Sequence, residues 1–322
     1  MVQGRLQRAH AASKWPLKSA AMANIQGRQD LVLGIGDDCA QVQVPQGQSL
    51  VFSMDTLVEG RHFPYDADPA AIGYRAVATC VSDLAAMGAK PAFFTLGLTL
   101  PHSDPQWLSA FAEGMAELAE PIGLVLLGGD TTKGPLTISL QVHGYVEPEW
   151  VVTRSAAKVG DDIYVTGMLG DAAAAVPIMT GEMMVKGDLY EHFYDAYWRP
   201  ESRLIAAMAL KRVVSSMLDV SDGLVQDIQH ILKASGVGAQ IDASLIPVSD
   251  VLAQWQPDSA LELALTGGDD YELCFTAPES ARDEISLITQ TLHLPCRKIG
   301  SITESGFEIE GYDGDFAGWQ HF

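Results

Sequence analysis

The chain has 322 residues, enough for two domains, because single hydrophobic cores stop growing at roughly 250 to 300 residues. Apolar residues make up 48% of it, and no apolar run reaches the ~18 residues of a membrane span, so we expect a soluble globular protein. The formal net charge of −21 repels phosphate backbones and anionic lipid surfaces. Because no basic patch offsets this charge, nucleic-acid and membrane-surface roles are excluded.

Residues 1–29 are basic and rich in small residues, a composition that also occurs in organelle transit segments. They lack the apolar core of a secretory signal, so a cytoplasmic protein is the better prediction. The chain has four widely spaced cysteines with no Cys-x-x-Cys pattern: Cys39, Cys80, Cys274 and Cys296. Most have apolar neighbours, and we therefore interpret them as buried, reduced thiols.

The first half of the chain mixes strand-like and helix-like segments. Pro69 suits the first turn of a helix, and apolar residues recur at helical spacing from Ile72 to Met87, with Asp83 next to that face. A second helix is predicted at 105–120, and strands are predicted at 31–33, 49–54, 93–100, 123–127 and 136–146.

A linker is predicted at 147–149, which divides the chain into a divergent segment at 1–30, an N-terminal domain at 31–147 and a C-terminal domain at 148–322. The C-terminal part is predicted to contain helices at 202–212 and 223–235 and strands at 162–167, 238–242, 271–276 and 297–302. Because strands and helices come in hairpin-like blocks, α+β is as defensible a class as doubly wound α/β.

Carboxylates next to small residues recur along the sequence. The first case is Gly34-Ile35-Gly36-Asp37-Asp38, where glycines allow a tight turn after a strand. A single such turn is weak evidence for a site, because Gly160-Asp161-Asp162 has the same three residue types and is interpreted as an ordinary turn. Similar groups recur around Asp55, Asp83, Asp130, Asp219 with Asp222, and Asp269 with Asp270. A single carboxylate of this kind is explained by an Asx-turn or a helix cap, whereas six such groups suggest a site.

Hard divalent cations suit such a site. Mg²⁺ takes a few carboxylate oxygens, keeps water and often binds substrate phosphates as well. The chain has no G-x-x-x-x-G-K-[ST] phosphate loop, G-x-S-x-G elbow or H-E-x-x-H zinc helix. Any phosphate chemistry is therefore expected to rely on metal bound by carboxylates. His62 beyond Asp55 is a structural residue or a substrate contact, and the spacing does not decide between them.

The acidic groups lie in longer motifs that resemble the thiamine-monophosphate kinase family. The motifs run in order from about residue 31 to the C-terminus: Gly34-Ile-Gly-Asp-Asp-Cys-Ala, Ser53-Met-Asp-Thr-Leu-Val-Glu-Gly-Arg-His-Phe, Val81-Ser-Asp-Leu-Ala-Ala-Met-Gly-Ala, Leu127-Gly-Gly-Asp-Thr-Thr, Asp219-Val-Ser-Asp-Gly-Leu, Gly267-Gly-Asp-Asp-Tyr-Glu-Leu and the closing Gly-Trp-Gln-His-Phe. The resemblance implies ATP-dependent phosphorylation of thiamine monophosphate to thiamine diphosphate. It also implies the two-domain fold of aminoimidazole-ribotide synthetase, with an N-terminal α+β domain that forms a homodimer and a C-terminal α/β domain.

The resemblance also assigns residues to roles. The implied magnesium ligands are Asp38, Ser53, Met54, Asp55, Asp83, Asp130, Asp219 and Asp222. The implied ATP contacts are Gly129, Asp130, Arg154 and Ser221, and the implied contacts to the thiamine part are His62, Asp269, Phe316 and Trp319. Asp55, Asp83 and Asp130 are expected to organise several Mg²⁺ ions between the two phosphates, without a covalent phosphoenzyme.

The chain departs from the family pattern at three places. Met54 stands where the family often has Thr, so a ligand there would have to be the backbone carbonyl. Asp269 stands where the family commonly has Glu, which predicts a shorter reach or a bridging water. Residues 1–30 lack the usual Gly-Glu-Phe opening. Two rival interpretations remain at this point: another ATP-using member of the same superfamily, and a metal-binding scaffold without catalysis.

Overall fold

A computed structural model of the chain describes residues 28–314. Within this range the chain forms two compact units, one made of residues 28–80 and 91–145, the other of residues 81–90 and 146–314. The N-terminal segment expected at 1–30 lies almost entirely outside the described residues, and so does the aromatic end of the chain with Phe316 and Trp319.

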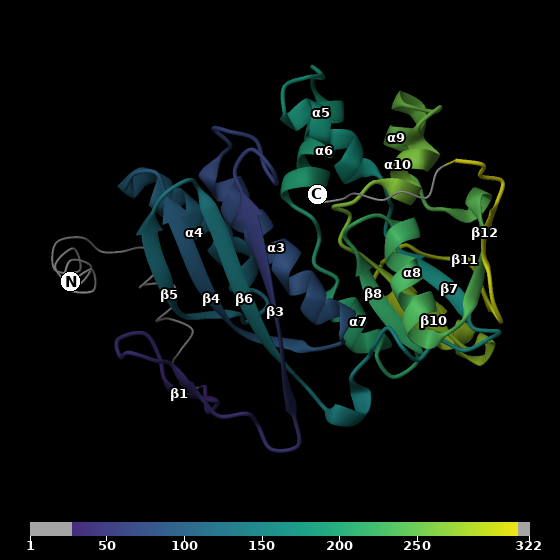
Figure 1. The fold of residues 1–322 in the computed structure, drawn as a ribbon, viewed down its shortest axis with the longest axis horizontal. Helices are drawn as coiled ribbons and strands as arrows, with labels where there is room; N and C mark the ends of the chain where they lie inside the picture. The colour runs from purple at the N-terminus through teal and green to yellow at the C-terminus, as the bar shows by residue number, and fades with distance from the viewer. Residues whose placement is uncertain (1–27, 315–322) are drawn as a thin grey trace. The chain divides into compact units, whose positions relative to one another are not determined.

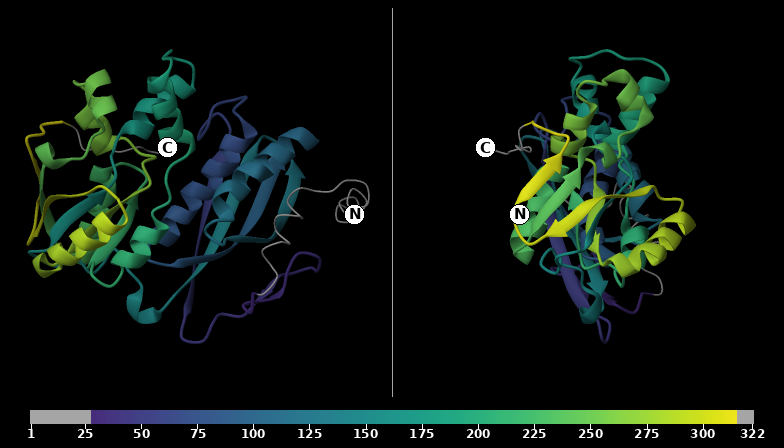
Figure 2. Two further views of the ribbon diagram at one scale, coloured as in Figure 1. Left: turned by 180° about the vertical axis from the view of Figure 1, so that it is seen from behind. Right: turned by 90° about the vertical axis from the view of Figure 1, so that its right-hand side faces the viewer.

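The first unit is built on a sheet of four strands, with helices on one face (Figures 1 and 2). In spatial order the strands are β3 (Ser49–Val58), β6 (Thr137–Val146), β4 (Lys90–Leu100) and β5 (Val125–Lys133). The helices are α3 (Pro69–Ala86) and α4 (Pro105–Ala119), close to their predicted bounds. Burial explains the arrangement, because α3 turns a fully buried row that includes Ile72, Ala76 and Cys80 to the sheet. The Cys80 thiol also donates to the carbonyl oxygen of Leu140 on β6.

The small hairpin of β1 (Leu31–Leu33) and β2 (Gln41–Val42) is held on this unit by Arg28. The Arg28 guanidinium pairs with Asp30 and donates to the carbonyl oxygens of Ala92, at 3.0 Å, and Gly123, at 2.9 Å. It also lies over the ring of Phe93, 4.3 Å from its centroid. Arg28 thereby fixes the entry to the hairpin that carries the Gly34–Asp38 turn.

Two of the expected acidic turns lie instead within strands. The prediction that strands end at Met54 and Leu127 is wrong, because β3 continues to Val58 and β5 to Lys133. At β5 the register against β4 shifts next to Gly128, which indicates a β-bulge. A Cβ on Gly129 would lie 1.9 Å from the carbonyl oxygen of Leu96, so this glycine permits close pairing and does not end the strand.

The second unit is built on a six-stranded sheet. In spatial order its strands are β12 (Phe307–Glu310), β9 (Gly238–Asp242), β11 (Cys296–Thr303), β7 (Asp162–Thr166), β10 (Glu272–Ala277) and β8 (Ser216–Val220). Every pairing is antiparallel except that of β12 with β9. The doubly wound alternative requires parallel strands, so the second unit is a mixed α+β structure.

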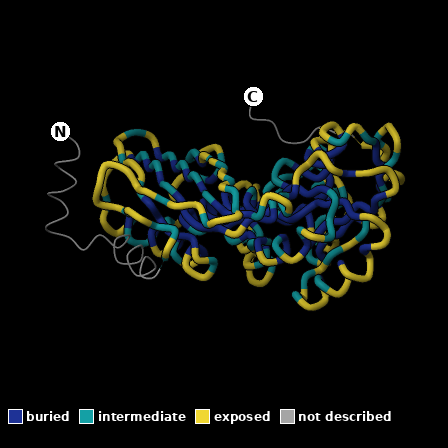
Figure 3. The backbone as a smooth tube through the Cα atoms, turned by 90° about the horizontal axis from the view of Figure 1, so that it is seen from below, coloured by how far each residue is buried: buried dark blue, intermediate teal, exposed yellow. Residues whose placement is uncertain are grey.

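Seven α-helices and three short 3-10 helices accompany this sheet within the described residues. The α-helices are α5 (Asp171–Met179), α6 (Asp188–Trp198), α7 (Leu204–Leu210), α8 (Leu224–Ser235), α9 (Asp250–Trp255), α10 (Ala260–Thr266) and α11 (Arg282–Thr291). The 3-10 helices are η1 (Pro148–Trp150), where the linker was predicted, η2 (Ala243–Leu245) and η3 (Glu279–Ala281). Of the α-helices, α7 and α8 match the predicted positions. Buried residues lie in the interior of each unit, and exposed residues lie mostly at its periphery (Figure 3).

The cysteine prediction holds only in part. All four thiols are free, and Cys80 and Cys274 are buried as predicted. Cys39, however, is exposed, and Cys296 is only partly buried. Cys39 lies in the polar turn after Asp38, where the flanking sequence gives no strand to bury it. Within residues 28–314, no helix has both the length and the apolar character that crossing a lipid bilayer requires.

Replacing Arg28 tests whether it anchors the hairpin. Arg28→Ala removes an ion pair, two hydrogen bonds to carbonyl oxygens and a cation–π contact, so the free energy of unfolding should fall by about 2 kcal/mol. Arg28→Lys keeps the charge but not the planar fork, and should give an intermediate loss. Urea unfolding of the three proteins measures this. Equal midpoints for Arg28→Ala and the unchanged protein would contradict the anchoring role.

Candidate functional site

The end of strand β8 carries three of the predicted site residues. Asp219 lies within the strand, and Ser221 and Asp222 form the turn before helix α8. Asp227, in the first turn of α8, fixes this turn, because its carboxylate accepts hydrogen bonds from the backbone N–H groups of Ser221, at 2.9 Å, and Asp222, at 3.0 Å. The side chains of Ser221 and Asp222 are thus presented from a backbone that is held in one conformation.

A second loop, residues 267–271, pairs with this strand end. The N–H of Asp269 donates to the Ser221 carbonyl oxygen at 2.9 Å, and the N–H of Tyr271 donates to the Val220 carbonyl oxygen at 2.8 Å. A Cβ on Gly268 would lie 2.3 Å from the Ser221 carbonyl oxygen, so only glycine permits this approach. Asp269 is therefore brought next to Ser221.

Two residues of this loop have left-handed backbone angles that side chains rarely adopt. Asp269 has a φ of 70° and Tyr271 a φ of 52°. Aspartate tolerates this region better than most residues, whereas a bulky tyrosine does not. Strain of this kind persists where surrounding contacts hold it, and it is common at binding sites.

Asp219 is a buried carboxylate with a negative neighbour. It is 5% exposed and accepts a hydrogen bond from the Ser82 hydroxyl at 2.7 Å. Burial, and after it the negative charge of Asp83, raise the pKa of Asp219 to about 7. Asp83 and Asp219, far apart in sequence, are therefore brought together within the second unit.

Arg154 is placed by helix α8. The Arg154 carbonyl oxygen accepts a hydrogen bond from Ser235 Oγ, at the end of the helix, at 2.9 Å. At the other end, burial raises the pKa of Asp227 to about 6, and the positive charge of Arg154 acts against that rise. One helix therefore carries the anchor of the Ser221–Asp222 turn and the anchor of the Arg154 segment.

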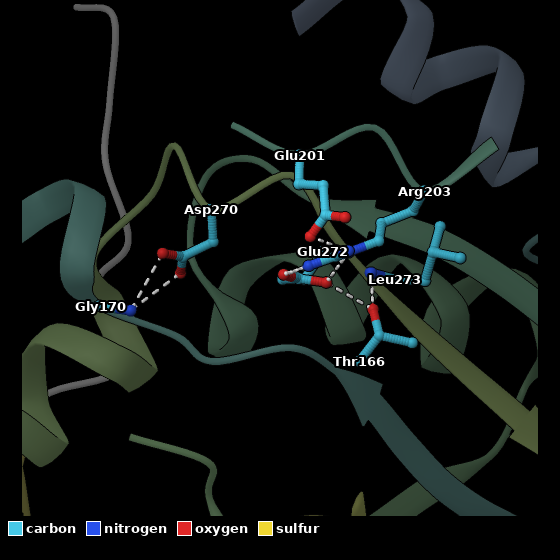
Figure 4. Close-up of polar contacts among 7 residues, drawn as sticks. All are labelled: Thr166, Gly170, Glu201, Arg203, Asp270, Glu272 and Leu273. Atoms are coloured by element: carbon cyan, nitrogen blue, oxygen red, sulfur yellow. Dashed lines mark hydrogen bonds and ion pairs between the residues drawn. The ribbon is translucent and has the colours of Figure 1, made fainter. Parts of the chain in front are cut away.

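Asp270 and Glu272 hold the same loop to the interior of the unit (Figure 4). The Asp270 carboxylate accepts from the N–H of Gly170, at 3.0 and 3.1 Å, at the start of α5. Glu272, on β10, accepts from the Thr166 hydroxyl at 2.6 Å and accepts two hydrogen bonds from one edge of the Arg203 guanidinium, through Nε and Nη2. These two carboxylates act within the structure, between the strands and helices that carry the site.

In the first unit, the predicted carboxylates lie apart. Asp55 is on β3 and Asp130 on β5, the two edge strands of the sheet. Three strand spacings separate them, roughly 14 Å, so one ion does not bridge both within this sheet. Met54 is 62% exposed on the opposite face of β3 from Ser53 and Asp55, and its side chain points away from theirs.

The two remaining predicted residues of this unit lie in loops. Asp38 is exposed in the turn between β1 and β2, and its N–H donates to Asp37 Oδ1 at 2.8 Å. His62 lies just after β3, and its Nδ1 accepts a hydrogen bond from the Val58 N–H at 3.0 Å. Because Nδ1 accepts, the neutral ring carries its proton on Nε2, which makes Nε2 a donor.

The donor set fits a hard cation. Among residues 28–314, no three or more His, Cys, Asp and Glu side chains are grouped as a metal site. Mg²⁺ does not require such a group, because it binds through one or two carboxylates and completes its octahedron with water and phosphate oxygens. Asp219 and the adjacent Asp83 offer oxygen donors and concentrated negative charge, which Mg²⁺ would neutralise.

Sequence reasoning missed three residues that hold the site together: Ser82, Asp227 and Tyr271. Ser82 and Tyr271 lie inside the quoted motifs but were given no role. Asp227 follows the Asp219 motif in the first turn of a helix, where an acidic residue usually reads as a dipole or cap feature. Phe316 and Trp319, predicted to contact the thiamine part, lie outside the residues that the structure describes.

Comparison with known proteins defines the class. The N-terminal domain model of the AIR synthase related proteins matches residues 36–146, and the C-terminal domain model of the same family matches residues 158–311. The chain is thus a two-domain AIR synthase related protein.

Comparison with individual proteins narrows the family further. The thiamine-monophosphate kinase of Escherichia coli K12 is 45% identical over 92% of this chain and 93% of its own length. The crystal structure of the thiamine-monophosphate kinase from Stenotrophomonas maltophilia K279a superimposes with a TM-score of 0.88 at 38% identity, over 94% of this chain and 98% of its own. AaThiL complexed with AMPPCP and TMP gives 0.79 at 30% identity, over 89% of this chain and 92% of its own. The chain belongs to the thiamine-monophosphate kinase family.

The partly buried carboxylate of Asp270 predicts a pH dependence of stability. Burial, followed by the charges of Glu272, Asp171 and Asp269, raises its pKa well above the usual range of an aspartate. The folded state therefore binds a proton more tightly than the unfolded state, and folding loses stability as pH rises above about 4. Asp270→Asn keeps an oxygen that accepts from Gly170, so it should raise the melting temperature at pH 8, with a gain that shrinks toward pH 4.

Asp162 provides the control of opposite sign. Arg282 and Lys298 lower the pKa of Asp162, so its contribution is present at neutral pH and lost as pH falls below its unfolded value. Asp162→Asn should lower the melting temperature at pH 8. If Asp270→Asn also lowers it at that pH, the assigned burial of charge at Asp270 is wrong.

Proposed function

We propose that this protein transfers the γ-phosphoryl group of ATP directly to thiamine monophosphate, which yields thiamine diphosphate and ADP in thiamine diphosphate biosynthesis in the cytoplasm. The main support is the pairing of the loop that carries Asp269 with the strand end and turn that carry Asp219, Ser221 and Asp222, because it unites motifs that lie far apart in sequence. Further support comes from the Escherichia coli kinase and from AaThiL, which is complexed with AMPPCP and TMP.

The chemistry needs no strong base. The phosphate of thiamine monophosphate is already anionic near neutral pH, since its second pKa is about 6. One of its oxygens forms the new bond to the γ-phosphorus as the bond to the β-phosphate oxygen breaks, and ADP leaves with that electron pair. The obstacle is repulsion between the two anionic phosphates, so positioning and charge relief carry the catalysis.

The proposed ligands for several Mg²⁺ ions are Asp38, Ser53, the Met54 carbonyl, Asp55, Asp83, Asp130, Asp219 and Asp222. When bound, Mg²⁺ supplies charge relief to the phosphate oxygens. Within the chain, Asp227 orients Asp222, and Ser82 supports Asp219. Asp55, Asp83 and Asp130 are proposed as the catalytic carboxylates.

The proposed ATP contacts are Gly129, Asp130, Arg154 and Ser221. The proposed contacts to the organic part of thiamine monophosphate are His62, Asp269, Phe316 and Trp319. His62 would donate from Nε2, since Nδ1 already accepts from Val58. Asp269 suits the cationic thiazolium or the amine of the pyrimidine, and an aromatic ring suits their flat faces.

We also propose that residues 31–147 and 148–322 act as the two domains, and that the first forms a homodimer. Strand β3 presents apolar side chains on the sheet face that points away from α3: Leu50 is 38% exposed, Phe52 64% and Met54 62%. A row of this kind on a monomer's surface is typical of a protein interface. A second copy of the chain would cover it through the same face, as two-fold dimers do.

Phosphorus NMR of the purified protein with ATP, Mg²⁺ and thiamine monophosphate tests the activity. Thiamine diphosphate and ADP should appear in equal amounts, and only when the thiamine compound is present. Consumption of ATP without this product would show that thiamine monophosphate is not the acceptor. Absence of any ATP consumption would reject the kinase activity.

Asp130→Asn should lower turnover by about 100-fold or more, the usual effect of removing a group that stabilises transition-state charge. The melting temperature should change little, because Asp130 is exposed on an edge strand. Asp104→Asn is the matched control in the same unit, since asparagine replaces aspartate well at the N-cap of α4. Near-normal turnover of Asp130→Asn would remove this residue from the site.

Phe52→Glu should convert a dimer into a monomer, because it places a charge in the proposed apolar interface. Sedimentation velocity at micromolar concentration measures the change. Leu287→Glu is the control, since Leu287 is an equally exposed apolar residue, at 66%, on helix α11. A monomeric parent protein, or a dimer that survives Phe52→Glu, would contradict the interface.

A further inference from the structure

Residues 269–272 divide their side chains between two tasks. Asp270 and Glu272 contact the interior of the unit, through Gly170 and Arg203 (Figure 4). Asp269 and Tyr271 instead contact each other, since the Tyr271 hydroxyl donates to Asp269 Oδ1 at 2.8 Å. The Tyr271 hydroxyl therefore bonds to a side chain of its own loop, whereas Asp270 and Glu272 bond to other segments of the unit.

The backbone of the loop is held without this hydroxyl. The N–H groups of Asp269 and Tyr271 bond to Ser221 and Val220 at 2.9 and 2.8 Å, and Asp270 bonds to the N–H of Gly170. Beyond the loop, β10 continues the same pairing with β8, where Glu272 lies opposite Val220. The hydroxyl of Tyr271 is thus additional to a loop that is already fixed by its backbone and by two carboxylates.

The effect of the hydroxyl is on the orientation of a carboxylate. The last torsion of an aspartate side chain is broad and roughly two-fold, so an unsupported carboxylate rotates. A phenol that donates to one carboxylate oxygen at 2.8 Å fixes that rotation through a charge-assisted hydrogen bond. The left-handed φ of both residues, 70° and 52°, accompanies this short-range pairing across two positions of the chain.

We propose that Tyr271 is a positioning residue for substrate recognition, whose hydroxyl orients the Asp269 carboxylate toward the organic cation of thiamine monophosphate. This inference rests on the proposed function, in which Asp269 contacts the thiamine part. Tyr271 acts through Asp269 and does not itself take part in phosphoryl transfer. Loss of the hydroxyl should therefore weaken binding of the acceptor and leave ATP binding and the chemical step unchanged.

The same unit offers a matched control. On strand β7 the Tyr164 hydroxyl donates to Asp162 Oδ2 at 3.4 Å, which is the same pair of residue types at the same spacing of two. Tyr164 is buried and stacked on Phe275, and it has no proposed part in the site. Tyr164→Phe removes a comparable hydroxyl from the same sheet.

The experiment measures kcat and both KM values by steady-state kinetics for the parent protein, Tyr271→Phe and Tyr164→Phe. Tyr271→Phe should raise the KM for thiamine monophosphate about tenfold, the effect of one charge-assisted hydrogen bond. Its kcat and its KM for ATP should stay within about twofold of the parent values, and Tyr164→Phe should change none of the three. A merely structural loss would not separate the two KM values in this way.

A double-mutant cycle with Asp269→Gly tests that Tyr271 acts through Asp269. Glycine accepts the φ of 70° at this position and removes the carboxylate. In that background Tyr271→Phe should change the KM for thiamine monophosphate by less than about twofold. If the two residues acted independently, the fold-changes in KM of the two single variants would multiply in the double variant.

Several outcomes would overturn the proposal: an unchanged KM for thiamine monophosphate in Tyr271→Phe, an equal rise in the KM for ATP, additive effects in the cycle, or loss of the cooperative melting transition. The last result would assign the hydroxyl to the fold of the loop. A parent protein without turnover of thiamine monophosphate would reject the proposed function, and this inference with it. An active parent whose Tyr271→Phe variant behaves normally would reject the role of Tyr271 alone.

Discussion

The close approach of two backbones, at Gly268 and Ser221, is the constraint on which the candidate site depends. A single added carbon at Gly268 would lie 2.3 Å from the Ser221 carbonyl oxygen, so any other residue would separate the loops. Their separation would break the bonds that seat Asp269 and Tyr271 beside strand β8. Asp227 fixes the other side of the same turn through its carboxylate. The positions of Ser221, Asp222, Asp269 and Tyr271 therefore depend both on this side chain and on the close approach of the two main chains.

Negative charge is handled in two ways within the second unit. Carboxylates that serve the fold meet a cation or a backbone N–H group: Glu272 is paired with Arg203, Asp162 is paired with Arg282 and Lys298, and Asp270 accepts from Gly170. Asp219, by contrast, accepts from a neutral hydroxyl and faces the negative charge of Asp83. A buried carboxylate in that setting is costly without an added cation, and this cost is consistent with a site that is completed only when its ligands bind.

The sequence predicted the elements that have strong local signals. Helices α3, α4 and α8 show helical spacing of apolar residues or clear caps, and they occur where expected. The predicted strand ends at Met54 and Leu127 were wrong, because a carboxylate beside small or polar residues reads as a turn. At the second strand, Gly129 instead serves close pairing with β4. The antiparallel order of the second sheet arises from contacts between segments far apart in sequence, which no local pattern contains. The bonds of Asp227 and Tyr271 join residues close in sequence, but their residue types and spacing do not by themselves predict them. The motifs nevertheless identified Asp219, Ser221, Asp222 and Asp269, which the fold unites.

Residues 81–90 group with the second unit, although helix α3 begins in the first. The second unit is therefore discontinuous in sequence, and Ser82, which supports the buried Asp219, reaches it from a segment encoded far upstream. A single recombination event at the boundary near residue 146 would join an Asp219 from one parent to a Ser82–Asp83 segment from another. Gene shuffling within this family should thus be tolerated mainly between parents that match in both places, so the two halves are expected to be inherited together.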